Sequence, residues 1–169
     1  MKKFLFLSLV LLGAAMAGSA QVLSLSVDDP NGPTNVRDGD NGKIVATIPV
    51  NSLAMLSVVA PHDGWWQIWE DKYWLPDEDQ AHQLSGSRTG YWIHYSTLTI
   101  STRNYGGETL ALRENPSEDS RAVFSFNEEL SFRPIDIRGE WVKVKTYDGK
   151  YEGWIEEEWL CGNPLTNCC

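Results

Sequence analysis

The chain has few of the residues on which most catalytic and metal sites depend. Its three histidines, His62, His82 and His94, do not form the His-Glu-x-x-His pattern of zinc hydrolases. The Gly-x-Ser-x-Gly turn that presents a nucleophilic serine is also missing. All three cysteines lie at the extreme C-terminus, without the nearby histidine that would activate a cysteine nucleophile. These absences predict a protein that is not an enzyme and that has no cofactor or metal site.

Positive charge is scarce as well. The chain has 14 lysine and arginine residues against 23 aspartate and glutamate residues, which gives a formal net charge of −9. Removal of an N-terminal segment with Lys2 and Lys3 would leave 12 basic and 23 acidic residues, a net charge of −11. Because an acidic chain repels the phosphates of nucleic acids, no nucleic-acid partner is expected.

Long apolar runs are absent after the N-terminus. Residues 1–20 begin with Lys2 and Lys3, continue through the apolar stretch 4–17 and end in small residues. This order is typical of a secretory signal peptide, and the apolar stretch is too short for a stable membrane span. We therefore expect an exported protein, periplasmic or secreted, with no stable membrane span after cleavage. The alternative is that residues 1–20 stay attached as an anchor.

The positions of the cysteines indicate a disulfide in the tail. Export places the chain in an oxidising compartment, where Cys161 can close a short loop with either Cys168 or Cys169. Adjacent cysteines seldom pair with each other, because the geometry is strained, so one thiol would be left over. A zinc site would need more ligands than this cluster offers.

In contrast to these absences, the chain is rich in tryptophan, with eight residues. So many indoles usually leave some on a surface that recognises a partner. Segments 63–69 and 139–144 both place glycine shortly before a tryptophan strand, and each is followed by a glycine–aromatic strand, at 90–93 and 153–155. One small β-module is therefore predicted to occur twice.

The spacing of these segments supports the repeat. Arg37 and Arg113 are 76 positions apart, and so are Trp65 and Trp141. The later glycine–aromatic strands are offset by only 63, so the first copy is expected to carry 13 extra residues. Short β-branched segments between Pro, Gly, Asn and Asp turns complete the pattern, which predicts a tandem all-β arrangement.

The order of short motifs in both copies resembles that of the bacterial SH3-like (SH3b) family. The motifs are an Asn-Val-Arg start, a turn, a Gly-Trp strand, a second glycine–aromatic strand and a closing leucine. In the first copy the matching residues are Asn35, Val36, Arg37, Gly64, Trp65, Ile68, Gly90, Trp92 and Leu98. In the second copy they are Leu112, Arg113, Pro116, Trp141, Val144, Gly153, Trp154 and Leu160.

The resemblance implies an all-β fold of two tandem small SH3-like barrels joined by a short linker. The expected organisation is a signal peptide at 1–20, a first domain at 21–98 with a long inserted loop at 71–89, and a second domain at 99–169 that includes the cysteines. The resemblance also implies a binding module of the cell envelope, which recognises a peptide, a peptidoglycan fragment or an envelope protein through aromatic surfaces. The alternative is a periplasmic inhibitor or immunity-type protein that blocks a partner enzyme, with the inserted loop as its plug.

The insertion at 71–89 is polar, with acidic residues at its centre. It is interpreted as a long loop with a short helix at 77–84, which Asp77 would cap. Asp79 and His82 stand about one helical turn apart and offer metal-binding atoms. A solvated acidic loop is far more common than a metal site in such a segment, so no metal is predicted.

Strand alternation separates the tryptophans of the first copy. By alignment with two valines that share a strand face in the second copy, Trp66 and Ile68 are assigned to the core. Trp65 and Trp69 then face outward. They are either covered by the inserted loop 71–89 or form an aromatic groove, since contiguous exposed aromatic surface usually marks recognition.

Five aromatic residues are therefore the candidate ligand-binding set: Trp65, Trp69, Tyr73, Trp74 and Trp141.

The equivalent arginines of the two copies allow two interpretations. Arg37 and Arg113 either recognise an anion or tie their own turns to a neighbouring carboxylate or carbonyl. Their recurrence in both copies favours the second, structural role.

Overall fold

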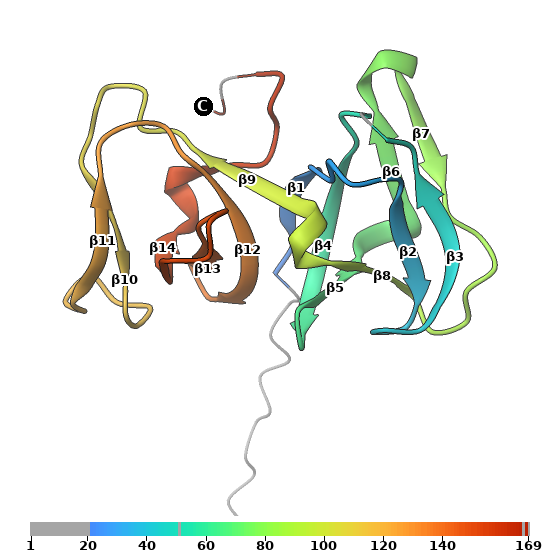
Figure 1. The fold of residues 1–169 in the computed structure, drawn as a ribbon, viewed down its shortest axis with the longest axis horizontal. Helices are drawn as coiled ribbons and strands as arrows, with labels where there is room; N and C mark the ends of the chain where they lie inside the picture. The colour runs from blue at the N-terminus through green and yellow to red at the C-terminus, as the bar shows by residue number, and fades with distance from the viewer. Residues whose placement is uncertain (1–20, 51, 167, 169) are drawn as a thin grey trace, which may run out of the picture.

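The computed structural model describes residues 21–50, 52–166 and 168, and this part of the chain is all-β, which confirms the predicted class (Figure 1). The predicted signal peptide at 1–20 lies outside the described residues. Among the described residues, no helix has the length and apolar character needed to cross a membrane.

The strands are β1 (Leu23–Val27), β2 (Thr34–Asp38), β3 (Lys43–Ile48), β4 (Met55–His62), β5 (Trp65–Ile68), β6 (Lys72–Leu75), β7 (Gln80–Gln83), β8 (Tyr91–His94), β9 (Leu98–Thr102), β10 (Leu110–Arg113), β11 (Ala122–Phe126), β12 (Ser131–Arg138), β13 (Trp141–Lys145), β14 (Glu152–Glu156) and β15 (Leu160–Cys161). Single 3-10 turns connect some of them: η1 (Trp69–Asp71), η2 (Pro76–Glu78), η3 (Tyr95–Thr97) and η4 (Glu157–Trp159).

All strands belong to one open antiparallel sheet with β3 and β11 at the ends of its main path. Figure 1 shows two lobes, a first lobe with β1–β8 and a second lobe with β10–β15, with β9 between them. The order β4-β5-β8-β2-β3 in the first lobe recurs as β12-β13-β14-β10-β11 in the second. That residues 21–98 and 99–169 are two separate copies of one domain remains a prediction.

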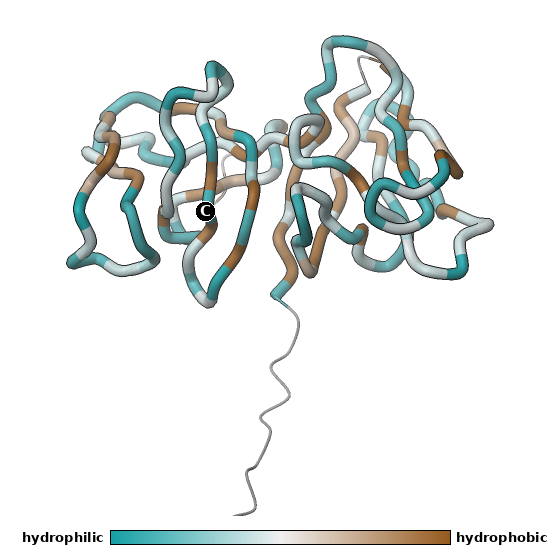
Figure 2. The backbone as a smooth tube through the Cα atoms, turned by 60° about the horizontal axis from the view of Figure 1, so that its bottom comes forward, coloured by the Kyte–Doolittle hydropathy of each residue, from teal (hydrophilic) through white to brown (hydrophobic). Residues whose placement is uncertain are grey.

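The register of the strands also recurs between the lobes. Val58 pairs with Ile68 as Pro134 pairs with Val144. The predicted offset of 76 therefore describes the spatial equivalence of β4–β5 and β12–β13. Figure 2 shows hydrophobic residues along the strands of both lobes and hydrophilic residues at many of the turns.

Strand β9 takes the place of the predicted short linker. Its first residues, Leu98 and Thr99, pair with β1 of the first lobe. Ile100 and Ser101 pair with β12, and the end of the strand pairs with β15, both in the second lobe. Because one strand belongs to both lobes, no flexible segment separates them.

Direct contacts further join the lobes. The Trp66 indole N–H, in the first lobe, donates a buried hydrogen bond of 3.0 Å to the carbonyl of Pro134 in the second. The Arg133 guanidinium donates to the carbonyls of Asp28 and Leu98, at 2.8 and 2.7 Å. These side chains fix one lobe against the other.

The core confirms the strand alternation predicted for the tryptophan segment. Trp66 is 0 % exposed and Ile68 is 2 % exposed. Their counterparts Val142 and Val144 are both fully buried. Successive residues of a strand point to opposite faces, so Trp65 points away from this core.

The predicted equivalence of Gly90 and Gly153 is wrong by one residue. Arg37 pairs with Trp92 as Arg113 pairs with Trp154, so Tyr91 is the counterpart of Gly153 and the first lobe has 14 extra residues. A Cβ on Gly153 would lie 2.8 Å from the backbone oxygen of Arg113, which explains the glycine there. Tyr91 fills the corresponding position of the first lobe as a buried side chain.

The predicted loop at 71–89 with a helix at 77–84 is also corrected. Strands β6 and β7 form a hairpin within it, and η2 with Asp79 makes the turn. The helix does not form because Asp79 takes a left-handed conformation, with φ 48°, and ends the 3-10 turn after three residues. The hairpin joins the sheet through the pairing of Met55 with Trp74, so it extends the first lobe instead of covering Trp65.

Candidate binding groove

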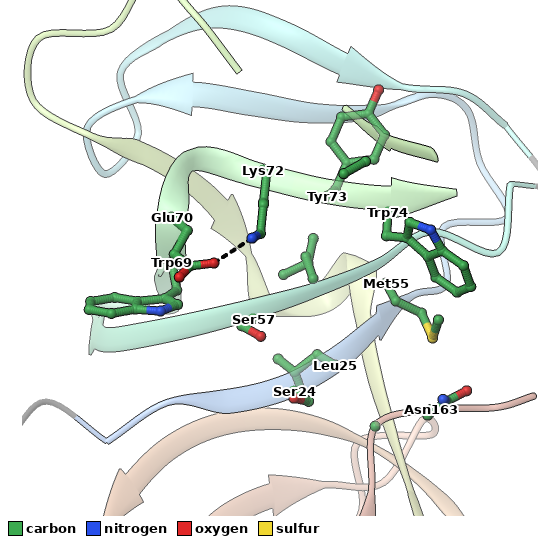
Figure 3. A pocket seen from close by; sticks show the side chains of 13 residues that line it. Ser24, Leu25, Met55, Ser57, Trp69, Glu70, Lys72, Tyr73, Trp74 and Asn163 are labelled. Carbon is green, nitrogen blue, oxygen red and sulfur yellow. Dashed lines mark ion pairs between the residues drawn. The ribbon is translucent and has the colours of Figure 1, made fainter. Parts of the chain in front are cut away.

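A groove of about 300 Å³ lies on the outer face of the first lobe, over β1, β4, β6 and β7 (Figure 3). We call it the groove and define it by six lining residues: Ser24, Met55, Ser57, Trp69, Trp74 and Asn163.

The register of four strands builds the floor of the groove. Ser24 of β1 lies opposite Ser57 of β4, and Met55 lies opposite Trp74 of β6. Trp74 in turn lies opposite Ala81 of β7. Because side chains alternate along each strand, these residues share the outward face, while their neighbours point into the core. Two serine hydroxyls and a row of apolar side chains therefore lie next to each other.

The 3-10 turn η1 places Trp69 at one end of the groove. Glu70 and Asp71 both have left-handed backbone conformations, with φ of 55° and 51°, which cost about 1 kcal/mol each in a residue with a side chain. They turn the chain just after the end of β5, so Trp69 belongs to the turn η1 and not to the strand. Trp69 is 42 % exposed, and Figure 3 shows its side chain at the opposite end of the groove from Trp74.

The charges beside the groove neutralise each other. The Lys72 ammonium lies 2.5 Å from the Glu70 carboxylate. Among the described residues that line the groove, these two are the charged ones. The groove therefore offers indole and thioether surface, two hydroxyls and an amide, which suits an uncharged ligand better than an ion.

Tyr73 borders the groove, but its ring turns away from it in Figure 3. The ring stacks on His82 of β7 at a centroid distance of 5.1 Å, with 9° between the planes. His82 Nε2 lies 2.9 Å from a Glu78 carboxylate oxygen. Burial raises the pKa of Tyr73, and the charge of Glu78 raises it further. Tyr73 therefore stabilises the hairpin.

Trp65 belongs to a different environment. It is half-buried and packs edge-to-face on His94, at a centroid distance of 5.0 Å. The Arg37 guanidinium lies 5.5 Å from its ring. Burial lowers the pKa of His94, and the charge of Arg37 lowers it further.

Trp141 lies in the second lobe, on β13, and is half-buried between Arg138 and Glu156 of the neighbouring strands. Of the five predicted binding residues, the structure thus brings Trp69, Tyr73 and Trp74 together at the groove and leaves Trp65 and Trp141 out of it.

The C-terminal tail forms one rim of the groove. A disulfide joins Cys161 to Cys168, one of the two predicted pairings, and Cys169 lies outside the described residues. Gly162 packs on the backbone of β1 so closely that a Cβ would lie 1.8 Å from the carbonyl oxygen of Ser24. Only glycine fits this approach, which holds Asn163 beside the groove.

The equivalent arginines Arg37 and Arg113 each bind a carbonyl of a neighbouring turn, as expected for a structural role. Arg37 donates to the carbonyl of Gly42 and Arg113 donates to the carbonyl of Ser120, both at 2.8 Å. Each bond links a strand to its own hairpin, which fits a scaffold role.

Sequence reasoning missed four of the groove residues. Ser24, Met55, Ser57 and Asn163 come from three separate parts of the chain, and none of them carries a motif. The alternation of serine with leucine in β1 was a usable signal for Ser24 as an outward residue. Nothing in the sequence placed the tail against β1.

Comparison with known proteins concerns mainly the second lobe. Residues 108–160 match the family model described as Bacterial SH3 domain. A search of curated proteins found no match. Among solved structures, NlpC1 from Trichomonas vaginalis is 13 % identical, over 90 % of this chain and 50 % of that one, with a TM-score of 0.31. NlpC2 from the same organism is 11 % identical, over 85 % of this chain and 48 % of that one, also with a TM-score of 0.31.

The chain thus spans about half the length of these two structures. TM-scores of this size are too low to support a conclusion from them. The family match is more informative, because it begins just before β10 and ends at Leu160, in β15. It therefore includes the whole strand set β10 to β14 of the second lobe, and it identifies a bacterial SH3 domain at residues 108–160.

Proposed function

We propose that the protein is an exported, non-enzymatic binding module of the cell envelope that takes its ligand in the groove. The ligand is a peptide, a peptidoglycan fragment or an envelope protein. The observation that carries the proposal is the exposed indole of Trp69 at the end of a groove that also includes Trp74. Exposed aromatic surface next to a few polar groups is the usual composition of a recognition site.

The proposal includes export and a tandem organisation. The bacterial SH3 domain at 108–160 and the disulfide in the tail fit an extracellular location. The basic and apolar order of residues 1–20 supports cleavage of a signal peptide. The repeated strand order supports the proposal that residues 21–98 are another copy of the domain found at 108–160, with the hairpin β6–β7 as an insertion.

The groove's chemistry supports binding without catalysis. The Glu70 carboxylate is held in an ion pair with Lys72, so neither is poised as a general acid or base. The hydroxyls of Ser24 and Ser57 have no histidine among the groove residues to activate them.

The test is binding of the mature protein to purified peptidoglycan by co-sedimentation and to envelope extract by pull-down. The double variant Trp69→Ala/Trp74→Ala should weaken binding at least about 10-fold, as expected when central aromatic anchors are removed. The matched control is Tyr105→Ala, which removes an exposed aromatic side chain from the other half of the chain. Undiminished binding by the folded double variant would refute the groove as the site.

A second candidate function is inhibition of a partner enzyme by the hairpin. The observation that favours it is the exposed acidic tip formed by Asp77, Glu78 and Asp79. The variant D77N/E78Q/D79N removes this charge and leaves Trp69 and Trp74 in place. Loss of partner capture in this variant alone would favour the inhibitor, whereas loss in the tryptophan variant alone favours the groove.

A further inference from the structure

The register of the two lobes identifies a surface of the second lobe that corresponds to the groove. Leu25 pairs with Leu56 in the first lobe as Ile100 pairs with Phe132 in the second. One position along each strand, Ser24 of β1 corresponds to Thr99 of β9, and Ser57 of β4 corresponds to Arg133 of β12. We call Thr99 and Arg133 the counterpart surface.

One of the protein's own side chains, Tyr147, lies across the counterpart surface and stays half exposed. Tyr147, from the short connection between β13 and β14, donates its hydroxyl to Asp28 Oδ2 at 2.6 Å and lies 2.7 Å from Thr99 Oγ1. The Arg133 guanidinium lies 4.1 Å from the centre of the tyrosine ring. A flat ring with a polar tip therefore covers the surface, and its hydroxyl reaches the strand position that Ser24 occupies in the first lobe.

The first lobe leaves the same place open. There the connection between β5 and β8 contains the hairpin β6–β7, and the side chains of Trp69 and Trp74 border the groove instead of filling it (Figure 3). Ser24 is exposed. Asn163 lies on the rim beside it, as Asp28, which follows β1, lies beside Thr99 at the counterpart surface.

From this correspondence we infer that the groove binds a tyrosine side chain of a partner peptide. The inference rests on the proposed binding function and names its ligand. The ring would lie in the groove between the indoles of Trp69 and Trp74, which stand at its two ends, and the phenol would be hydrogen-bonded by Ser24 and Asn163. The neutralised pair of Glu70 and Lys72 suits this uncharged side chain. A tyrosine is preferred to a sugar because the protein itself places a tyrosine on the matching surface.

The experiment follows amide chemical shifts of the mature, oxidised protein in titrations with N-acetyl-tyrosinamide, N-acetyl-phenylalaninamide, N-acetyl-leucinamide and tri-N-acetylchitotriose. We expect saturable shifts at groove residues with the tyrosine amide. The phenylalanine amide should bind roughly 3- to 10-fold more weakly, because it lacks one hydrogen bond. Ser24→Ala should reduce that preference, whereas Thr99→Ala, which alters the counterpart surface, should leave it unchanged.

A second variant blocks the groove by adding a large side chain at an exposed position, so the core is left unchanged. Ala81 of β7 is exposed and lines the groove, so Ala81→Trp should fill it and abolish the shifts while the thermal transition stays close to that of the parent. Equal binding of the leucine and tyrosine amides, shifts outside the groove, binding of chitotriose alone, or no saturable binding would each overturn the inference. In those cases, retention of peptidoglycan or envelope partners that still depends on Trp69 and Trp74 would leave the proposed function intact.

Discussion

Replacement of Trp66 by phenylalanine tests how strongly the two lobes are joined. The indole is fully buried, and its N–H donates to the carbonyl of Pro134, itself buried, at 3.0 Å. Phenylalanine keeps an aromatic ring at the position but removes the donor. The variant therefore leaves a buried carbonyl without its partner and opens a cavity between the lobes.

Both consequences have a known scale. An unsatisfied buried polar group costs about 1–3 kcal/mol. The loss of about 40 Å³ of side-chain volume adds about 1 kcal/mol, at about 24 cal/mol per Å³ of cavity. Together they lower the free energy of unfolding by about 2–4 kcal/mol, which for a chain of this length corresponds to a fall in Tm of about 5–15 °C.

The assay is thermal unfolding by circular dichroism and calorimetry, together with urea titration. Trp65→Phe is the matched control, because Trp65 is the next residue along the same strand and is only half-buried against His94. We expect the control to change the free energy of unfolding by less than about 1 kcal/mol. A fall in Tm of less than about 2 °C for Trp66→Phe, or equal effects of the two substitutions, would show that the hydrogen bond to Pro134 does not join the lobes.

Three further substitutions test other contacts. Gly162→Ala should lower Tm and weaken binding in the groove, because a Cβ there would lie 1.8 Å from the Ser24 oxygen; a melting curve and shift titration identical to those of the parent would contradict the close packing of the tail. Burial and the charge of Arg37 lower the pKa of His94, so the unfolded chain binds a proton more readily and stability should fall as pH drops below about 6.5. Urea titrations between pH 7 and pH 5 should show a smaller loss for His94→Gln, and an equal loss would mean that His94 does not contribute. Tyr147→Phe removes the hydroxyl that donates to Asp28 and should lower the free energy of unfolding by about 1 kcal/mol, measured by calorimetry. An unchanged free energy of unfolding would show that this hydrogen bond does not stabilise the fold.

Local pattern was enough to predict the core of the tryptophan strand. The two-residue period of a strand assigns Trp66 and Ile68 to one face, and both are buried. The same period assigns Trp69 to the outward side, and Trp69 is exposed, but β5 ends at Ile68 and the left-handed residues Glu70 and Asp71 turn the chain just after Trp69. Two acidic residues give no local sign that they will adopt this conformation, so the exact position of Trp69 could not be predicted.

The groove itself depends on contacts between distant parts of the chain. Ser24 meets Ser57 through the pairing of β1 with β4, and Asn163 reaches them because the tail packs on β1. The hairpin β6–β7 was hidden by its acidic turn, which favoured the interpretation of 71–89 as a loop. A single sequence records which residues alternate along a strand, but the register between distant strands is set by the packing of the whole sheet.

The two lobes share a strand order but differ in one connection, the one that follows β5 in the first lobe and β13 in the second. In the second lobe the short connection after β13 lays Tyr147 over Thr99 and Arg133. In the first lobe a hairpin replaces it, and pairing of that hairpin with β4 carries Trp74 to the border of the groove and leaves Ser24 uncovered. Because β9 belongs to both lobes, the surface under Tyr147 and the open groove stand on one continuous sheet. The insertion therefore adds a hairpin beside β4 and opens a groove in the first lobe, while β4, β5, β8, β2 and β3 keep the strand order of the second lobe.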